Sequence, residues 1–289
     1  MIDSDTRLCC LIGHPVGHSV SPQMHNAAFK ALGLNYIYLA FDVKAEDLET
    51  AVLGLKALGA AGFNVTIPHK ISVMEFLDEV DGSARAVGAV NTVVNAGGVL
   101  RGFNTDVYGV REALKIAKPS RSEPALVIGA GGAARASIAA LLNLGFQEII
   151  IANRTLERAR ELARWIEGMG GSAIACGLEE GRMKARRCSV IINATPIGMH
   201  PNISETPIES DDIPGGAIVL DLVYNPLKTR LLEEAERAGA KPISGIEVLV
   251  YQGAYAFRLW TGREAPVEVM RAAAIKALKR GGSDEDCQG

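Results

Sequence analysis

Short apolar segments alternate with longer segments of helical periodicity along most of the chain. Strands are expected at residues 8–12, 36–43 and 63–67, and helices at residues 22–32 and 48–58. Gly33 and Gly59 follow the two helices, at the position where a glycine commonly ends a helix. Repeated strand–helix units predict a mostly parallel sheet with helices on both faces.

The third of these strands ends in an unusual turn. Phe63, Val65 and Ile67 alternate with polar residues, which predicts a strand with one apolar face. A proline then ends the strand, and Lys70 stands just before a helix expected at residues 71–80. A lysine at the end of a strand, where the chain changes direction, is a candidate for chemistry.

The rest of the chain predicts a second domain. Strands at 89–94 and 99–103 are joined by Asn-Ala-Gly-Gly, which suits a hairpin and predicts an antiparallel edge on the first sheet. A second series has strands at 125–128, 148–152, 190–192 and 218–222 and helices at 133–144, 156–169 and 228–238. The pattern therefore predicts an α/β protein of two domains with a cleft between them. Two last helices, 246–260 and 267–279, could pack on either domain.

A glycine-rich turn joins the first strand and the first helix of the second series. Gly129-Ala130-Gly131-Gly132-Ala133-Ala134 fits the G-x-G-x-x-A pattern. The first glycine allows a tight turn, the second lets a pyrophosphate approach the backbone, and the final alanine lets the helix lie close to the sheet. An ordinary glycine-rich turn is the simpler explanation, but the flanking strand and helix favour a dinucleotide site.

The end of the next strand indicates which dinucleotide is bound. NAD sites usually carry a carboxylate about 20 residues downstream, which binds the ribose 2′-hydroxyl. This chain instead has Asn153-Arg154-Thr155, with Arg158 one helical turn later. Two guanidinium groups could bind a phosphate, and cations at a helix N-terminus oppose the helix dipole unless an anion is present. The pattern therefore predicts NADP.

Two serines precede the first helix. Ser21 stands directly before a proline, which makes it a natural N-cap, whereas Ser19 has no such structural explanation. Alternation points both hydroxyls the same way, and together at a helix N-terminus they could receive a carboxylate. His14, His18 and His25 match no common metal-ligand spacing, so no metal is expected.

Composition narrows the classes of partner. The chain of 289 residues has 30 basic and 33 acidic side chains, and a net charge of −3 gives no electrostatic reason to bind nucleic acid or an anionic membrane. Its five cysteines have no metal-like spacing, and their odd number argues against a disulfide framework. With no signal-peptide pattern and no apolar run of about 20 residues, a cytoplasmic, soluble protein is expected.

Lys70 and Asp106 are the candidates for proton chemistry. Oxidation of an alcohol by hydride transfer needs a group that takes the hydroxyl proton or stabilises the alkoxide, and a lysine can do either. Asp106 follows the last strand of the first domain, and a carboxylate there could hold the lysine in place. Each residue alone has a simpler explanation. Lys70 could be a solvated lysine at a helix start, and Asp106 could be an N-cap.

The chain resembles shikimate dehydrogenases along nearly its whole length. The matching motifs are Ser19–Pro22, Asn64–Lys70, Gly88–Thr92, Gly102–Asp106, the Gly129 turn, Asn153–Thr155, Asn193–Met199, Asp221–Pro226 and Tyr251–Ala254. The resemblance implies an NADP-dependent oxidoreductase that interconverts 3-dehydroshikimate and shikimate, a step towards chorismate and the aromatic amino acids. So many motifs in the same order make the resemblance specific.

The resemblance also implies roles for individual residues, with Lys70 and Asp106 as the catalytic pair. Ser19 and Ser21 would hold the substrate carboxylate, Thr66, Lys70, Asn91, Asp106 and Gln252 would bind its hydroxyls, and Tyr224 would close the pocket. NADP would be bound by Gly129, Ala130, Gly131, Gly132, Ala133, Asn153, Arg154, Thr155 and Arg158, with Thr195, Met199, Val223 and Gly245 on the nicotinamide side. Gly82 departs from the family pattern, because many relatives have an acidic residue near the cofactor there.

By the same resemblance, residues 1–105 and 245–289 would form the substrate domain and residues 106–244 a Rossmann-like NADP domain. Three alternatives stay open. The chain could use quinate as well as shikimate, it could be another two-domain dehydrogenase such as a methylene-tetrahydrofolate enzyme, or it could be an NADP-binding regulator without activity. Thr66, Asn91 and the two arginines favour shikimate and NADP. The sequence does not determine the oligomeric state, for which a homodimer is one candidate.

Overall fold

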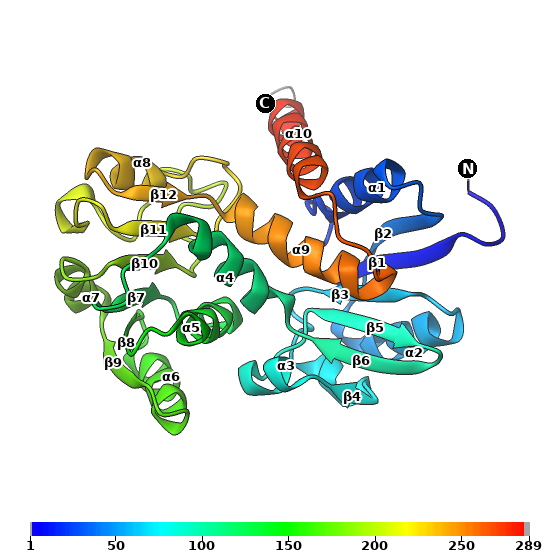
Figure 1. Ribbon diagram of the computed structural model, residues 1–289, viewed down its shortest axis with the longest axis horizontal. Helices are drawn as coiled ribbons and strands as arrows, with labels where there is room; N and C mark the ends of the chain where they lie inside the picture. Colours follow the sequence, from blue (N-terminus) through cyan, green and yellow to red (C-terminus); the bar gives the residue numbers. More distant parts are fainter. Residues whose placement is uncertain (1, 286–289) are drawn as a thin grey trace. The chain divides into compact units, whose positions relative to one another are not determined.

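The computed structural model describes residues 2–285, with side chains up to residue 280, and the chain forms two compact units. Unit 1 comprises the chain up to Thr105 and from Val250 onward, and unit 2 comprises Asp106–Leu249. Helices α4 (Thr105–Ala117) and α9 (Gly245–Thr261) each cross from one unit to the other. Each unit contains a six-stranded sheet with helices packed against it, which confirms the predicted α/β class with two domains (Figure 1).

The sheet of unit 1 is mixed. Its strands are β1 (Arg7–Gly13), β2 (Tyr36–Asp42), β3 (Gly62–Val65), β4 (Glu79–Val80), β5 (Thr92–Ala96) and β6 (Val99–Phe103), in the order β2-β1-β3-β5-β6-β4. β1 pairs in parallel with β2 and β3, whereas β5 pairs antiparallel with both β3 and β6. The predicted hairpin is confirmed, but the prediction that it forms the edge is wrong, because β4 pairs in parallel with β6.

Helices cover this sheet on both faces (Figure 1). The helical segments are α1 (Ser21–Ala31), η1 (Ala45–Asp47), α2 (Leu48–Ala57), η2 (Ser72–Phe76), α3 (Gly82–Val87) and α10 (Val267–Glu285). Val52 of α2, Val73 of η2 and Ala84 of α3 pack against Phe63 and Val65 of β3 in one core cluster. On the other face, α1 contacts β2 and α10.

Two predictions for the segment around Lys70 are wrong. The expected helix at 71–80 is replaced by η2 and β4, because residues 79–80 pair with β6 and the Asp78 carboxylate accepts a hydrogen bond from the Leu100 amide at 2.7 Å. The strand does not have a polar face either: Asn64 is buried, and Ile67, which was expected on the apolar face, is 73% exposed beyond the end of β3.

The sheet of unit 2 is entirely parallel. Its strands are β7 (Ala125–Ile128), β8 (Glu148–Ala152), β9 (Ser172–Cys176), β10 (Val190–Asn193), β11 (Ile218–Asp221) and β12 (Lys241–Ile243), in the order β12-β11-β10-β7-β8-β9. The chain reverses its direction of winding between β7 and β10. This is the order of a doubly wound dinucleotide-binding fold, which binds its ligand beyond the carboxyl ends of the strands at that reversal point.

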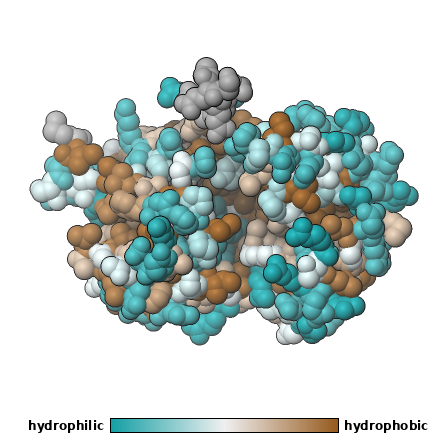
Figure 2. Space-filling model, turned by 180° about the vertical axis from the view of Figure 1, so that it is seen from behind, coloured by the Kyte–Doolittle hydropathy of each residue, from teal (hydrophilic) through white to brown (hydrophobic). Residues whose placement is uncertain are grey.

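Helices α5 (Gly132–Leu144), α6 (Leu156–Gly168), α7 (Leu178–Ala185) and α8 (Arg230–Arg237) and the short η3 (Ser210–Asp212) complete unit 2. α5 contacts β7, and α6 contacts β8. Leu126, Ile191 and Val219 of the sheet pack in one cluster with Ala185 of α7 and Leu231 of α8. On the surface seen in Figure 2, hydrophilic and hydrophobic residues are interspersed over both units. Within residues 2–285, no helix has the length and apolar character that a membrane span requires.

Candidate functional site

The glycine-rich turn has the geometry that the sequence predicts. Gly129 has φ +114°, a conformation that favours glycine, and its amide donates to the Ala152 carbonyl oxygen at 2.8 Å. Gly131 and Gly132 are exposed, and a Cβ on either would meet no atom within 4 Å. The space beside the first residues of the 13-residue α5 is therefore open, and the first turn of α5 contains no acidic residue. This arrangement fits a pyrophosphate.

Two arginines follow the neighbouring strand β8: Arg154 lies in the turn before α6, and Arg158 lies in the first turn of α6. Arg154 and Arg158 are exposed, and among the described residues neither guanidinium has a hydrogen bond or an ion pair. Arg160 and Arg164 of the same helix differ, because both contact Glu157, at 3.4 and 3.0 Å. Arg154 and Arg158 are therefore available to an anion, as a 2′-phosphate requires.

The other predicted cofactor residues at this edge are at least partly accessible. Ala130 and Asn153 are half-buried, and Ala133 and Thr155 are exposed. The Asn153 side-chain amide donates to the Thr155 carbonyl oxygen at 2.8 Å, which shapes the turn between β8 and α6.

The residues predicted on the nicotinamide side follow three strands: Thr195 and Met199 follow β10, Val223 follows β11, and Gly245 follows β12. Thr195 lies beside the glycine turn, because a Cβ on Gly129 would stand 3.1 Å from its Cγ2. Met199 is 46% exposed, whereas Val223 is buried. Gly245 packs tightly, since a Cβ there would be 2.5 Å from the Leu222 carbonyl oxygen. The structure thus brings Thr195 to the reversal point that the strand order defines.

Sequence reasoning missed the buried residues that hold these turns. Asn193 and Asp221, the last residues of β10 and β11, are fully buried and joined by a 2.9 Å hydrogen bond from Asn193 Nδ2 to Asp221 Oδ1. Thr229 Oγ1 donates to Asp221 Oδ2 at 2.6 Å. Burial raises the pKa of Asp221 to about 6. Polar residues at the ends of otherwise apolar strands were the available signal.

A second network of buried polar residues joins predicted substrate residues in unit 1. The Tyr38 hydroxyl donates to Asn64 Oδ1 at 2.7 Å, and burial raises the Tyr38 pKa well above its ordinary value. Asn91 Oδ1 accepts the Thr105 amide at 2.7 Å, and Thr105 Oγ1 donates to Gln252 Oε1 at 3.2 Å. Asn91 and Gln252 are therefore in one network, which also contains Tyr38 and Thr105, two residues without a predicted role.

The predicted N-cap role of Ser21 is wrong. α1 begins at Ser21 itself, with Val20 at the N-cap position and no capping side-chain bond, because the helix starts one residue earlier than expected. The Ser19 hydroxyl oxygen instead accepts the Ser21 amide at 3.3 Å. Ser21 is 8% exposed, and Ser19 lines a cavity of about 540 Å³ together with Lys276 of α10.

The turn that carries Lys70 is held by backbone bonds. The His69 amide donates to the Thr66 carbonyl oxygen at 2.9 Å, and the buried His69 ring is hydrogen bonded to the Val43 carbonyl oxygen at 2.6 Å. The carbonyl oxygen of Lys70 accepts the Val90 amide at 2.8 Å. Thr66 and Lys70 are both half-buried, so their side chains are partly accessible at the end of β3.

The remaining predicted residues have defined places in their own units. Asp106 is the second residue of α4 and half-buried, so it lies inside the helix and is not its N-cap. Tyr224 is half-buried, and burial raises its pKa. Gly82 begins α3, and a Cβ there would meet no atom within 4 Å, so the space that an acidic side chain would need is open. Among the side chains of residues 2–280, no three His, Cys, Asp or Glu are grouped as a metal site would require.

The strand order of unit 2, its open glycine turn and its two uncommitted arginines define a dinucleotide-binding α/β protein with a second α/β unit. Three family models match the chain: the shikimate dehydrogenase substrate binding domain at residues 11–93, shikimate / quinate 5-dehydrogenase at 111–213, and the shikimate 5′-dehydrogenase C-terminal domain at 245–275.

Proteins that match this chain over nearly their full length are also shikimate dehydrogenases. A shikimate dehydrogenase (NADP⁺) of Methanopyrus kandleri is 54% identical over 284 residues, or 96% of this chain and 98% of the relative. A shikimate dehydrogenase crystallised with NADP⁺ has a TM-score of 0.89 at 46% identity, over 96% of this chain and 98% of its own. The Thermus thermophilus enzyme, crystallised with NADP(H) and shikimate, has a TM-score of 0.85 at 39% identity, over 94% and 99%. The chain belongs to the shikimate dehydrogenase family.

Proposed function

We propose that this chain catalyses the reversible, NADPH-dependent reduction of 3-dehydroshikimate to shikimate. The observation that carries the proposal is a combination of two features in a member of this family. Unit 2 has an open glycine turn and two arginines without partners among the described side chains, and unit 1 has Lys70 at a strand end and a buried polar network. Residues 1–105 and 245–289 would form the substrate domain and residues 106–244 the NADP domain. We also propose a cytoplasmic location.

In unit 2, the glycine turn would receive the pyrophosphate on the α5 amides. Arg154 and Arg158 would bind the 2′-phosphate, with Asn153 and Thr155 shaping the turn that presents them. A side chain at Gly131 would occupy the space that the phosphates need, which is why its open surroundings support the assignment. Thr195, Met199, Val223 and Gly245 would form the nicotinamide side.

In unit 1, Ser19 and Ser21 would hold the substrate carboxylate, and Thr66, Asn91 and Gln252 would bind the ring hydroxyls. The buried network beneath Asn91 and Gln252 supports this role, because it fixes both amide side chains before the substrate arrives. The family resemblance implies that Tyr224 also takes part in binding the substrate.

Lys70 and Asp106 would handle the proton. NADPH, when bound, supplies the hydride that goes to the ketone carbon. Lys70 Nζ would donate a hydrogen bond to the ketone oxygen, stabilise the negative charge that develops there, and deliver a proton to form the hydroxyl. Asp106 would orient the ammonium group and share hydroxyl binding. In the reverse direction the same groups would take the hydroxyl proton.

Use of quinate as a second substrate is the alternative, and the match of residues 111–213 to the shikimate / quinate family model favours testing it. Initial rates of oxidation of shikimate and of quinate, each with NADP⁺ and with NAD⁺, test both proposals together. We expect kcat/KM to be highest for shikimate with NADP⁺. Faster turnover of quinate, or turnover of neither substrate, would contradict the main proposal. Sedimentation of the purified chain determines whether it is a homodimer.

A further inference from the structure

Asp221 is a buried carboxylate that has no cationic partner among the described residues. The residue is 0% exposed at the end of β11, and its two oxygens accept three hydrogen bonds, all from neutral donors. Asn193 Nδ2 and the Val223 amide donate to Oδ1 at 2.9 and 3.0 Å, and the Thr229 hydroxyl donates to Oδ2 at 2.6 Å. Burial without a cation is costly, as the raised pKa of about 6 indicates. A carboxylate that is buried at such a cost in folding free energy is a candidate for a functional role.

Asn193 links the Asp221 carboxylate to the turn after β10. Its Oδ1 accepts both the amide and the hydroxyl of Thr195, at 3.0 and 2.6 Å. Its Nδ2 donates to the Ile197 carbonyl oxygen at 3.2 Å as well as to Asp221. One amide side chain therefore fixes the turn after β10 and connects it to the turn after β11.

Two of the residues that these hydrogen bonds hold, Thr195 and Val223, are proposed to lie on the nicotinamide side. Thr195 is held through Asn193, Val223 is held directly through its amide, and Thr229, the N-cap residue of α8, ends the second turn. Asp221 itself is too buried to touch a ligand. Its effect on a reaction would therefore pass through the positions of Thr195 and Val223.

We propose that Asp221 and Asn193 are positioning residues for hydride transfer: together they fix the two strand-end turns that face the nicotinamide ring. This inference rests on the proposed function. An ionised carboxylate is a stronger acceptor than an amide, and here it organises three donors from two turns and a helix start. An error of about 1 Å in the position of a reacting ring can lower a rate about 100-fold, so turns this close to the ring must be held firmly.

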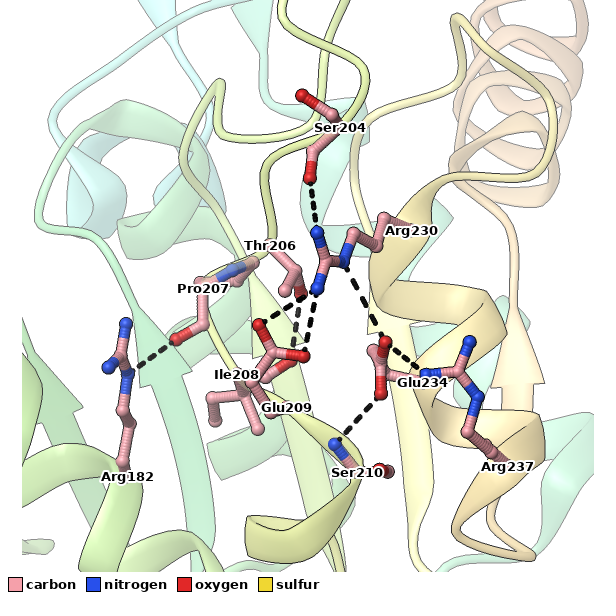
Figure 3. A network of polar contacts seen from close by, with 10 residues as sticks. All are labelled: Arg182, Ser204, Thr206, Pro207, Ile208, Glu209, Ser210, Arg230, Glu234 and Arg237. Carbon is pink, nitrogen blue, oxygen red and sulfur yellow. Dashed lines mark hydrogen bonds and ion pairs between the residues drawn. The ribbon is translucent and has the colours of Figure 1, made fainter.

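A second buried carboxylate in unit 2 offers a matched control. Glu234 of α8 is 1% exposed and accepts the Ser210 amide at 3.1 Å, while Arg237 and Arg230 contact it at 2.7 and 3.7 Å (Figure 3). Arg230 also donates to the Ser204 carbonyl oxygen at 2.9 Å. This network fixes a later part of the same connection between β10 and β11, and none of the residues drawn in Figure 3 is a proposed site residue.

The test compares Asp221→Asn with Glu234→Gln in the full chain. For Asp221→Asn, which keeps nearly the same shape, we expect kcat for shikimate oxidation to fall at least 10-fold. Its melting temperature should be unchanged or higher, and its Kd for NADP⁺, which depends mainly on the phosphate contacts, should change less than threefold. For Glu234→Gln we expect a lower melting temperature with kcat within twofold of wild type.

A near-normal kcat in Asp221→Asn, or a loss of kcat that follows the loss of thermal stability in both variants, would overturn the inference. If Asp221→Asn does not fold, Thr229→Val and Thr229→Ser decide: only Val removes the hydroxyl that bonds Asp221, so only Val should lower kcat. A wild-type chain that does not turn over shikimate would overturn the proposed function and this inference with it. An active wild type with an equally active Asp221→Asn would overturn the inference alone.

Discussion

Gly129 lies directly against the backbone of Ala194: a Cβ on Gly129 would stand 2.9 Å from the Ala194 carbonyl oxygen. The Ala194 amide in turn donates to the Ile128 carbonyl oxygen at 2.8 Å, so the turns after β7 and β10 are packed together. The glycine turn is therefore a structural joint of unit 2 as well as a place for a ligand. Gly131, two residues later, has extended backbone and open surroundings.

This contrast predicts that alanine has different effects at the two glycines. Gly129→Ala should destabilise the fold by about 1–3 kcal/mol, because it combines a strained φ with a backbone clash. Gly131→Ala should leave the melting temperature unchanged and weaken NADP⁺ binding, because its methyl group occupies the space for the phosphates. Thermal unfolding with and without NADP⁺ measures both effects. Equal melting temperatures for the two variants would contradict the prediction.

Cofactor preference should depend on Arg154. Its guanidinium has no other partner among the described side chains, so Arg154→Ala should remove a charge-assisted bond to the 2′-phosphate worth ~1.5–3 kcal/mol, or roughly 10- to 150-fold in KM for NADP⁺. KM for NAD⁺ should hardly change, because NAD⁺ has no 2′-phosphate.

Arg160→Ala is the matched control for this substitution. Arg160 is exposed on α6, the helix that follows Arg154, but contacts Glu157, so its loss should change neither constant by more than about twofold. Equal losses for NADP⁺ and NAD⁺ in Arg154→Ala would remove the basis for the arginine assignment.

The elements with strong periodicity could be predicted from the sequence, and those held by tertiary pairing could not. The glycine turn was found because its chemistry is local: strand, glycines and helix are consecutive. β4 and β12 are two and three residues long and exist only through pairing with β6 and β11, so no period could indicate them. α4 was missed because it begins directly after β6, without a turn signal.

The buried polar residues were hidden for a different reason. Tyr38, Asn64 and Thr105 lie up to 67 residues apart in the chain. Only the fold brings their hydrogen-bonding groups together. Asn64 was expected on a polar face because it alternates with apolar residues. Polar residues within buried strands indicate such networks, but the partner cannot be found without the sheet order.

The stability of unit 1 should depend on His25 at mildly acidic pH. His25 is fully buried and neither ring nitrogen has a hydrogen-bond partner among the described residues, while its ring stacks on Tyr38 with centroids 4.5 Å apart. Burial lowers its pKa from 6.5 to about 3. Above pH 6.5 both the folded and unfolded chains have a neutral ring. Below that pH only the unfolded chain binds the proton, so the free energy of unfolding falls by up to ~1.4 kcal/mol per pH unit until about pH 3.

His25→Leu removes this titration and isolates it from the carboxylates that titrate in the same range. The difference in free energy of unfolding between wild type and variant, measured by urea unfolding from pH 7.5 to 4.5, should shift steadily in favour of the variant as the pH falls. Parallel curves over that range would show that His25 gains a proton in the folded protein as readily as in the unfolded one.

The last prediction concerns Lys70, which ends the turn after β3 with its backbone fixed by Val90. If its ammonium group acts mainly in the transition state, Lys70→Met should lower kcat by about 10²–10⁴-fold and leave KM for shikimate within a few fold, because proton transfer and not substrate binding is lost. Lys30→Met is the control: it removes an exposed lysine of α1 and should leave both constants unchanged. Asp106→Asn should also lower kcat, and the double variant should lose much less than the product of the two single losses, because residues that act as a unit are not additive. Fully multiplicative losses would mean that the two residues act independently, and a near-normal kcat in Lys70→Met would leave this lysine as a solvated side chain at the end of a strand.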